Sequence, residues 1–313
     1  MSVVSSTSCE SSSDAISIQE PESVAIIQPE PEPRKVSYDL PLTPVVTIKA
    51  SKPWSPLDLR FLWSHRELLY FLIWRDIKVR YKQTLLGATW AILQPLVMMI
   101  IFTLFLSKVM RFPTEGVPSP LFYYAGFCLW TFFSNAVMNG ANSLIGNTNL
   151  ITKIYVPRLI IPSAAVLAGL LDFVIASLLF VPMLIYYDVR ITWSILFLLP
   201  LSIILTTLSL GGGVLFSALN TKYRDVRYAL PFLLQVWMFI SPVIYPSGIV
   251  PRQWRWLFAM NPLTGIIESY RAALFGQPLQ HLSLAYSIFF TVVLLSVSAY
   301  TFRRMEKSFA EVI

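Results

Sequence analysis

The feature that most limits how this chain can fold is the length of its uncharged stretches. Residues 83–107, 116–152 and 191–221 each contain no Asp, Glu, Lys or Arg. About 20 apolar residues in a helix are enough to cross a hydrocarbon core of ~30 Å. Charged residues make up only 13% of the chain, against about 25% in typical soluble domains. The sequence therefore predicts an all-α integral membrane protein.

Six stretches are apolar enough to be interpreted as membrane spans, and together they form a transmembrane domain of residues 85–305. The expected spans are residues 86–109, 121–144, 159–187, 193–219, 228–244 and 282–302. Between the last two, residues 246–276 are rich in Trp and Tyr and are divided by Asn261 and Pro262. Neither part is long enough to span. We therefore expect a re-entrant helix pair there, with protein or water covering its irregular backbone.

The two ends of the chain differ from this domain. Residues 1–56 are rich in Ser, Pro and Glu, which favours a disordered tail, and they lack the basic start and apolar core of a signal peptide. Lys and Arg gather in the loops that share a side with both termini, so the positive-inside rule places the tail and the C-terminal residues 306–313 in the cytoplasm. Because the net charge of +7 comes largely from such loops, it does not indicate nucleic-acid binding.

The segment before the first span, residues 57–84, is expected to contain an interfacial amphipathic helix. At 100° per residue, one face of this helix carries three basic residues: Arg75, Lys78 and Lys82. Asp76 and Arg80 lie four residues apart on the opposite side, as a pair among apolar residues. Anionic lipid headgroups would hold the basic face, whereas an Asp–Arg pair in apolar surroundings needs a protein partner. We therefore expect the helix to pack against protein as well as lipid.

Polar residues inside the predicted spans have more than one interpretation. Asn135, Asn139 and Asn142 repeat at helical spacing, so they either hydrogen-bond to a neighbouring helix or form the polar wall of a conduit. Asp172 lies in the third span, where a carboxylate costs about 2.5–3.5 kcal/mol, and it should face protein or water opposite a Lys, Arg or Asn. Glycines 211–213 permit either close helix packing or a flexible point.

The chain contains no motif for catalysis or for cofactor binding. It lacks the phosphate-binding G-x-x-x-x-G-K-[ST] loop and the H-E-x-x-H and G-x-S-x-G motifs. His65 and His281 are isolated, and Cys9 and Cys128 make neither a plausible structural disulfide nor a metal site. We expect no catalytic residue, no metal and no cofactor in this chain. A membrane-embedded glycosyl- or acyltransferase stays open as an alternative.

Several short motifs in a fixed order give the chain a family resemblance. The first runs from Arg75 to Lys82 (Arg-Asp-Ile-Lys-Val-Arg-Tyr-Lys) and is followed by Leu86, Gly87 and Trp90. The others are Lys153-Ile-Tyr-Val-Pro-Arg158, Asn220-x-x-Tyr-Arg-Asp-Val226, Ser241-Pro-Val-Ile-Tyr245 and Asn261-Pro-Leu263. Across residues 58–305, these motifs resemble those of the membrane subunits of type-2 ABC exporters of polysaccharides, which include O-antigen, capsule and teichoic-acid permeases.

The resemblance implies a six-span subunit that forms a homodimer in the bacterial cytoplasmic (inner) membrane. The dimer would bind two copies of a separate cytoplasmic ABC ATPase, which would hold ATP and Mg, and its substrate would be a lipid-linked polysaccharide. The surface helix at 60–83 and the loop at 149–157 would contact that ATPase, and residues 246–276 would form the outer gate. A drug or small-lipid exporter of the same superfamily would use the same scaffold and is a further alternative.

These expectations assign roles to individual residues. The predicted ATPase-coupling residues are Arg66, Glu67, Asn149, Leu150, Ile151, Thr152, Lys153, Ile154, Tyr155, Val156 and Pro157. Asn149 is expected to cap a short helix that Pro157 ends. The basic residues predicted to contact the lipid diphosphate through charge-assisted hydrogen bonds are Arg75, Lys78, Arg80 and Lys82. The residues predicted to line the channel or its gate are Trp237, Phe239, Tyr245, Trp254, Trp256, Tyr270 and Asp172.

Overall fold

The computed structural model describes residues 65–82, 84, 87–111, 114, 116–153, 156–190 and 192–306, without the side chains of residues 252, 255 and 257. The predictions for the tail at 1–56, for Ile154 and Tyr155, and for the end of the chain after residue 306 lie outside these residues.

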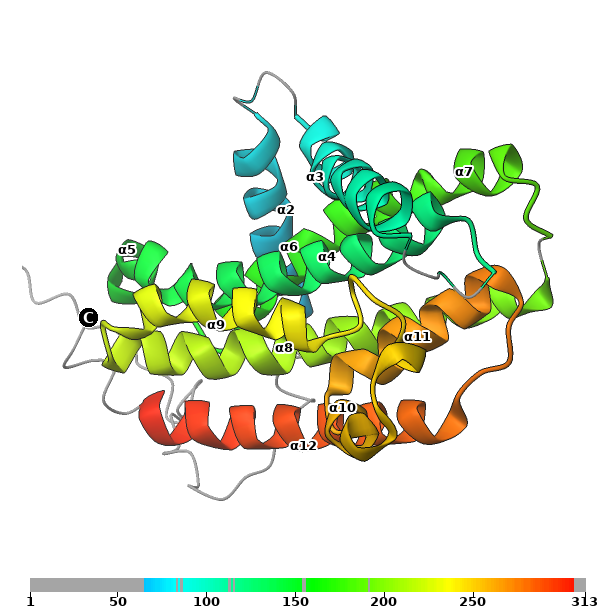
Figure 1. Ribbon diagram of the computed structural model, residues 1–313. Coiled ribbons are helices and arrows are strands. Elements are labelled where there is room, and N and C mark those ends of the chain that lie inside the picture. The colour runs from blue at the N-terminus through cyan, green and yellow to red at the C-terminus, as the bar shows by residue number, and fades with distance from the viewer. Residues whose placement is uncertain are drawn as a thin grey trace, which may run out of the picture. The chain divides into compact units, whose positions relative to one another are not determined.

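Every regular element in the described part of the chain is a helix, and this part contains no strand (Figure 1). Its first half contains α2 (Arg66–Tyr81), α3 (Thr89–Phe102), the π-helical η1 (Thr103–Val109), α4 (Ser119–Gly146), α5 (Thr148–Lys153), α6 (Ile160–Leu178) and α7 (Phe180–Tyr186). Its second half contains the 3-10 helix η2 (Trp193–Phe197), α8 (Leu198–Lys222), α9 (Val226–Ile240), the 3-10 helices η3 (Ser247–Ile249) and η4 (Arg252–Trp254), α10 (Arg255–Ala259), α11 (Pro262–Phe275) and α12 (His281–Glu306). The predicted all-α class is confirmed.

Among the described residues, five helical segments are long and apolar enough to cross a membrane: Thr89–Val109, Ser119–Gly146, Ile160–Tyr186, Trp193–Lys222 and His281–Glu306. They correspond to five of the six predicted spans. The remaining one, predicted at 228–244, is α9, whose 15 residues extend about 22 Å and so fall short of a ~30 Å core. The helix ends early because Pro242 disfavours a helical conformation at Ser241, which is extended.

α4 is the best-covered of these segments, and it packs against both α6 and α8. Small residues permit the close approach: a Cβ atom added to Gly140 of α4 would lie 2.8 Å from the Cα of Gly213 in α8. A Cβ on Gly211 would lie 3.2 Å from Leu294 of α12. The close-packing interpretation of glycines 211–213 is therefore confirmed.

α2 crosses the direction of α4, α6 and α8 instead of running along them (Figure 1). It packs mainly against α6, where Leu72 is buried in a hydrophobic cluster that we call the Leu72 cluster. Its buried members are Leu72, Leu144, Val156, Ile160, Ile161, Ala164, Val214, Ala218 and Phe302. The expectation that this helix packs against protein is confirmed.

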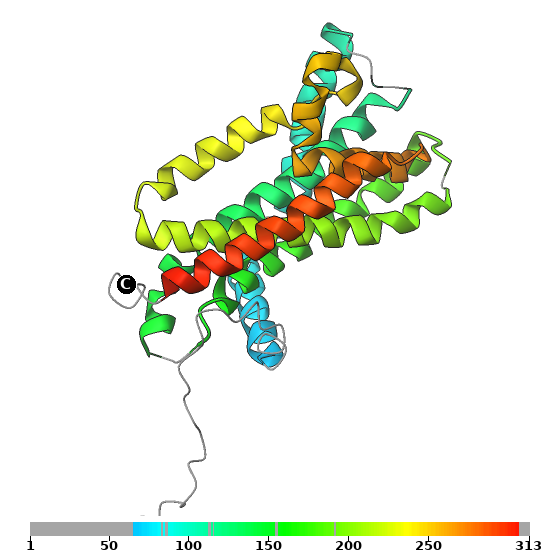
Figure 2. The ribbon, with the colours of Figure 1, turned by 90° about the horizontal axis from the view of Figure 1, so that it is seen from below.

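α9 stands apart from α8 in the view of Figure 2, and only Leu230 and Leu234 of its residues are buried.

The predicted break after α10 occurs where expected. Asn261 caps α11, because its side-chain oxygen accepts from the backbone N–H of Leu263 at 3.1 Å, and Pro262 occupies the first position of the helix. α11 then packs against α12 and α8. Its re-entrant placement in a membrane stays a prediction.

Candidate functional site

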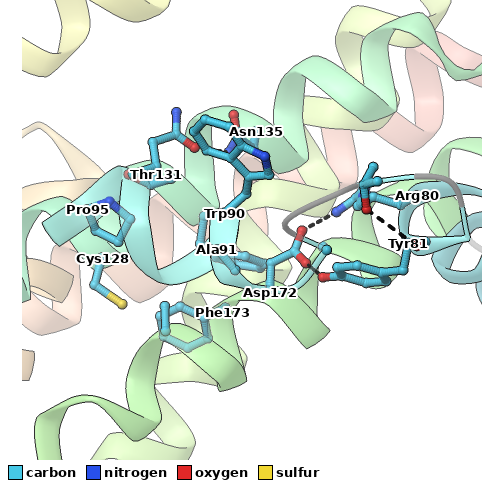
Figure 3. Close-up of a pocket in the computed structure, with 16 residues that line it drawn as sticks. Arg80, Tyr81, Trp90, Ala91, Pro95, Cys128, Thr131, Asn135, Asp172 and Phe173 are labelled. Atoms are coloured by element: carbon cyan, nitrogen blue, oxygen red, sulfur yellow. Dashed lines mark hydrogen bonds and ion pairs between the residues drawn. The ribbon is translucent and has the colours of Figure 1, made fainter. Parts of the chain in front are cut away.

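A cavity of about 170 Å³ lies where the end of α2 meets α3, α4 and α6 (Figure 3). We call it the α2–α6 pocket. Its lining combines an ion pair, an aromatic face and neutral polar side chains. The lining residues that Figure 3 labels are Arg80, Tyr81, Trp90, Ala91, Pro95, Cys128, Thr131, Asn135, Asp172 and Phe173.

One end of the α2–α6 pocket holds an ion pair between Arg80 of α2 and Asp172 of α6 (Figure 3). Arg80 Nη1 donates to Asp172 Oδ2, and the Tyr81 hydroxyl donates to Asp172 Oδ1. Burial and the adjacent carboxylate raise the pKa of the Tyr81 hydroxyl, so it stays protonated as a donor. The expectation that Asp172 faces a Lys, Arg or Asn is confirmed.

The expected protein partner is found for Arg80, but Asp76 and Arg80 lie apart in their contacts. Asp76 Oδ1 accepts instead from its neighbour Arg75, at 2.7 Å from Nη2 and 3.0 Å from Nε. Arg80 is drawn away because α2 crosses α6 at its C-terminal end and brings Arg80 to Asp172. Two of the four basic residues predicted to contact a diphosphate therefore have carboxylate partners inside the protein, whereas Lys78 and Lys82 are exposed.

α3 forms the aromatic wall of the pocket. Gly87, with φ +45°, lies in the turn that leads into this helix. Trp90 and Gln94 are four residues apart and so share one side of α3; both line the pocket. Trp90 is 55% exposed. Pro95 has no N–H to donate to the Ala91 carbonyl, and both of these residues line the pocket as well.

α4 contributes neutral polar groups to the facing wall. Asn135 Nδ2 lies 3.5 Å from Gln94 Oε1, and Thr131 lies about one turn earlier on the same helix. Asn142 has another partner, because Asn220 Nδ2 of α8 donates to its Oδ1 at 3.1 Å. The interhelical interpretation is confirmed at Asn142, and the conduit wall stays a prediction. Asn135 lines a cavity, and Asn142 joins two helices.

The aromatic residues predicted to line a channel occupy different environments. Trp237 packs edge-to-face on Phe133 at 5.3 Å, and its indole N–H donates to Asn261 Oδ1 at 3.1 Å. Tyr270 is buried in the core, whereas Trp254 and Trp256 are 50% and 62% exposed. None of these aromatic residues lines the α2–α6 pocket, and their channel role stays a prediction.

Two further predicted gate residues, Phe239 and Tyr245, are joined by a hydrogen bond. The Tyr245 hydroxyl donates to the Phe239 carbonyl at 2.9 Å, which folds the chain after α9 back onto the end of that helix. The Phe239 ring is 55% exposed. These two residues therefore shape the connection between α9 and η3.

The predicted coupling segment forms the short helix α5. The helix begins at Thr148, so Asn149 lies inside its first turn and the predicted cap at Asn149 is wrong. The Asn147 carbonyl accepts the first bonds instead, from the backbone N–H of Leu150 at 3.0 Å and of Ile151 at 3.2 Å.

α5 and α2 rest on the same hydrophobic cluster. Leu150 and Ile151 of α5 and Leu68 and Leu69 of α2 pack against the Leu72 cluster, and Val156 belongs to it. The exposed residues of these two elements include Arg66, Glu67, Asn149, Thr152 and Lys153. The two segments predicted to contact an ATPase therefore share one hydrophobic cluster, although about 80 residues separate them in the chain.

Sequence reasoning missed the role of Arg271 in α11. This residue is only 5% exposed, and its Nη1 and Nη2 donate to the carbonyls of Pro242 and Val243 at 2.7 and 2.8 Å. Its guanidinium carbon lies 3.6 Å from the centroid of the Phe122 ring. Arg271 thus ties the chain after α9 to α11 and α4. A cationic residue within an apolar stretch of sequence could have indicated that Arg271 needs a partner, as the isolated Asp172 did in the third span.

The described residues contain no group of three or more His, Cys, Asp or Glu that could hold a metal ion. In the α2–α6 pocket, the carboxylate of Asp172 is engaged by Arg80 and Tyr81. The thiol of Cys128 is buried. What the described lining of this pocket offers is hydrogen bonding and an aromatic face.

Comparison with known proteins identifies the family. Residues 67–275 match the family described as ABC-2 type transporter. The chain is 30% identical over 264 residues to the O-antigen export system permease protein RfbA of Myxococcus xanthus, a match that covers 82% of this chain and 98% of that protein. It is 27% identical over 248 residues to the RfbA permease of Klebsiella pneumoniae, covering 79% of this chain and 95% of the relative. It is also 26% identical over 250 residues to the polysialic acid transport protein KpsM of Escherichia coli, covering 76% and 93%. The chain belongs to the ABC-2 type transporter family.

Proposed function

We propose that this chain is the channel-forming membrane subunit of an ATP-driven transporter that exports a lipid-linked polysaccharide across the bacterial cytoplasmic membrane. The match to an O-antigen export permease over 98% of that protein's length carries the proposal. A polysialic acid transport protein is matched over 93% of its length. Relatives named for two different polysaccharides therefore share this scaffold, which supports the substrate class and not one particular glycan.

The energy for transport comes, in this proposal, from two copies of a separate cytoplasmic ABC ATPase bound to a homodimer of this chain. Both termini lie in the cytoplasm, as the distribution of Lys and Arg indicates. The exposed residues of α5 and of the start of α2 form the contact with the ATPase. Because both elements pack against the Leu72 cluster, a push on α5 moves α2 as well.

The diphosphate of the lipid carrier is held by the basic residues of α2. Lys78 and Lys82 are exposed and can give charge-assisted hydrogen bonds to phosphate oxygens at the membrane surface. Arg80 is engaged by Asp172 of α6, which holds the helix in place, and Arg75 is engaged by its neighbour Asp76 within α2. The two lysines therefore carry most of the predicted diphosphate contact.

Residues 246–276 form the outer gate in this proposal. Arg271 supports it by binding the carbonyls of Pro242 and Val243. This contact fixes the end of the α9 connection against α11, which gives the gate a rigid base.

The test is deletion of the gene in the bacterium that encodes the chain, followed by re-expression. We expect surface polysaccharide to disappear and lipid-linked glycan to accumulate inside the cell, and re-expression to restore both. Surface-glycan labelling of intact cells and quantification of lipid-linked glycan in membrane extracts provide the two measurements.

Other outcomes would contradict the proposal in different ways. Unchanged surface glycan with greater sensitivity to drugs would point to a drug or small-lipid exporter. Glycan that reaches the surface but lacks one sugar or acyl group would point to a transferase.

A further inference from the structure

We propose that the α2–α6 pocket is a binding subsite for one neutral sugar ring of the transported glycan. The inference rests on the proposed function, which supplies the transported glycan as the source of the sugar. The chemistry of the pocket lining indicates that the ligand is a neutral sugar ring.

The charges in the pocket are already paired, which disfavours an ionic ligand. Both carboxylate oxygens of Asp172 accept hydrogen bonds, one from Arg80 and one from Tyr81. A phosphate entering the pocket would have to compete with Asp172 for Arg80, and a cationic drug would have to compete with Arg80 for Asp172. A neutral ligand meets neither cost.

The remaining polar groups are neutral and can both donate and accept. The contact between Asn135 Nδ2 and Gln94 Oε1 uses one donor and one acceptor of these two amides. The Gln94 NH₂ group and the Asn135 carbonyl stay available in the part of the chain that the structure describes. The Thr131 hydroxyl adds to this set. Such a mixture suits a ligand with several hydroxyl groups, each of which also donates and accepts.

Trp90 adds a flat apolar surface beside these polar groups. Its side chain lines the pocket and is 55% exposed. A pyranose ring has an apolar face of C–H groups and an edge of hydroxyls, so it can lie on the indole while its edge meets Gln94 and Asn135. Gln94 and Asn135 are exposed, and an acyl chain on the indole would cover their amide groups without giving them hydrogen-bond partners, which costs free energy for each group.

The size of the pocket limits the ligand to one ring. Its volume of about 170 Å³ is below the ~300 Å³ at which pockets for drug-sized ligands begin. Gly169 lines the pocket on α6, and a Cβ atom added there would meet only Phe132, at 3.9 Å. A larger side chain at Gly169 would therefore occupy the space that the ligand needs without a severe clash at its Cβ.

A cysteine-protection experiment tests ligand class directly. The complex of this chain with its ATPase, in lipid nanodiscs, would carry Cys9→Ser, Cys128→Ala and a reporter Thr131→Cys. We expect octyl β-glucoside to slow alkylation of the reporter several-fold, whereas octyl phosphate and octanol do not. A matched reporter, Trp193→Cys, replaces an 85% exposed side chain outside the pocket and should react equally fast with all three probes. If octyl phosphate protects the reporter equally well, the pocket is an anion site and the proposal is wrong. If octanol protects it equally well, the pocket is an acyl-chain site and the proposal is wrong. If octyl β-glucoside gives no protection, the proposal is overturned.

A second measurement keeps the native cysteines. Trp90→Ala and Gly169→Val should raise several-fold the concentration of lipid-linked glycan that half-maximally stimulates ATP hydrolysis, and Trp90→Phe should raise it less because a flat ring remains. Trp193→Ala is the control and should leave this concentration unchanged. Identical values for wild type, Trp90→Ala and Gly169→Val would overturn the subsite. If no lipid-linked glycan stimulates the wild-type complex, the proposed function fails, whereas the protection experiment still decides whether the pocket binds a sugar.

Discussion

Asp172 shows how a single acid is accommodated inside an apolar helix. Its two oxygens are satisfied by Arg80 and Tyr81, which approach from a helix that crosses α6. Arg271 is the corresponding case for a buried cation, because two backbone carbonyls and an aromatic face surround it. At both positions the cost of burying a charge is offset by partners that lie far away in the chain.

The Arg80–Asp172 pair should appear as an energetic coupling. Asp172→Asn and Arg80→Gln each leave one charge without its partner, so each should lower the thermal stability of the complex, and the double variant should lose less than the sum. The side chains are 30% and 29% exposed, and solvent screening therefore limits the coupling to about 1–2 kcal/mol. Thermal unfolding of the four proteins in nanodiscs measures it. Asp188→Asn, at an exposed loop position, serves as the control, and strictly additive losses would refute the coupling.

Arg271→Lys tests the buried cation. An ammonium group cannot fork to two carbonyls and stack on Phe122 as a guanidinium does, so at least one carbonyl of Pro242 and Val243 loses its donor. We expect a loss of about 1–3 kcal/mol and faster proteolysis of the segment between α9 and α11. Arg190→Lys, at an exposed site, should change neither. If Arg271→Lys is as stable and as protease-resistant as wild type, the paired hydrogen bonds from Arg271 to the two carbonyls are not needed.

At the scale of the helices, contact between α4, α6 and α8 depends on the absence of side chains. Gly140 and Gly213 face each other so closely that a Cβ on either meets another atom within 3.0 Å. In a membrane, where lipid is as apolar as leucine, such close approach is a main source of helix association. α2 follows a different principle, since it is held by Leu72 and by one ion pair, and its exposed side carries Tyr70, Phe71 and Trp74.

Two glycines of α4 provide a matched comparison. Gly140→Ala would place a methyl group 2.8 Å from the Gly213 Cα and 2.9 Å from Val166 Cγ2, and we expect it to cost about 1–3 kcal/mol through overpacking. Gly146→Ala meets nothing within 4 Å and should be neutral or stabilising by up to about 1 kcal/mol, because alanine is the better helix former. Thermal unfolding of both variants in nanodiscs measures the difference. Equal effects at the two positions would mean that the α4–α8 contact is not tight.

At the scale of the whole molecule, the described helices link the proposed ATPase contact to the proposed substrate site. α5 packs against the Leu72 cluster, α2 lies on the same cluster, and the C-terminal end of α2 forms one end of the α2–α6 pocket. A displacement of α5 can therefore reach the pocket through packed side chains. The connection is physical contiguity, and its use as a coupling route requires a measurement.

A crosslink at Asn149 provides that measurement. With Asn149→Cys on the exposed side of α5, we expect crosslinking to the partner ATPase whose yield changes when ATP is bound, because α5 moves relative to the ATPase during the cycle. Trp193→Cys is the control. Trp193 lies in η2, just before the N-terminal end of α8, outside the proposed ATPase contact, and it should give no crosslink. A yield at position 149 that is the same with and without ATP would contradict the coupling role.

Much of the architecture followed from local features of the sequence. Six apolar stretches predicted six spans, and five of them coincide with described helices that are long and apolar enough to cross a membrane, because a membrane imposes a minimum apolar length on any crossing helix. The break at Asn261 and Pro262 was also predictable, since capping and proline geometry act within a few residues. The predicted span at 228–244 extends beyond the end of α9 at Ile240, because Pro242 favours the extended conformation of Ser241.

The sequence by itself determined the helical class, most helix positions and the need of Asp172 for a cationic partner, since each depends on composition or on neighbours along one helix. Only the tertiary structure decided that this partner is Arg80, 92 residues away, and that Asp76 pairs with Arg75 instead. It also decided that Trp90 and Asn135 line one cavity, and that Arg271 supports the connection after α9. The physical reason is that α2 crosses the other helices, and the angle and register of a crossing depend on how several surfaces fit together at once. A pattern read along one helix describes only one of those surfaces.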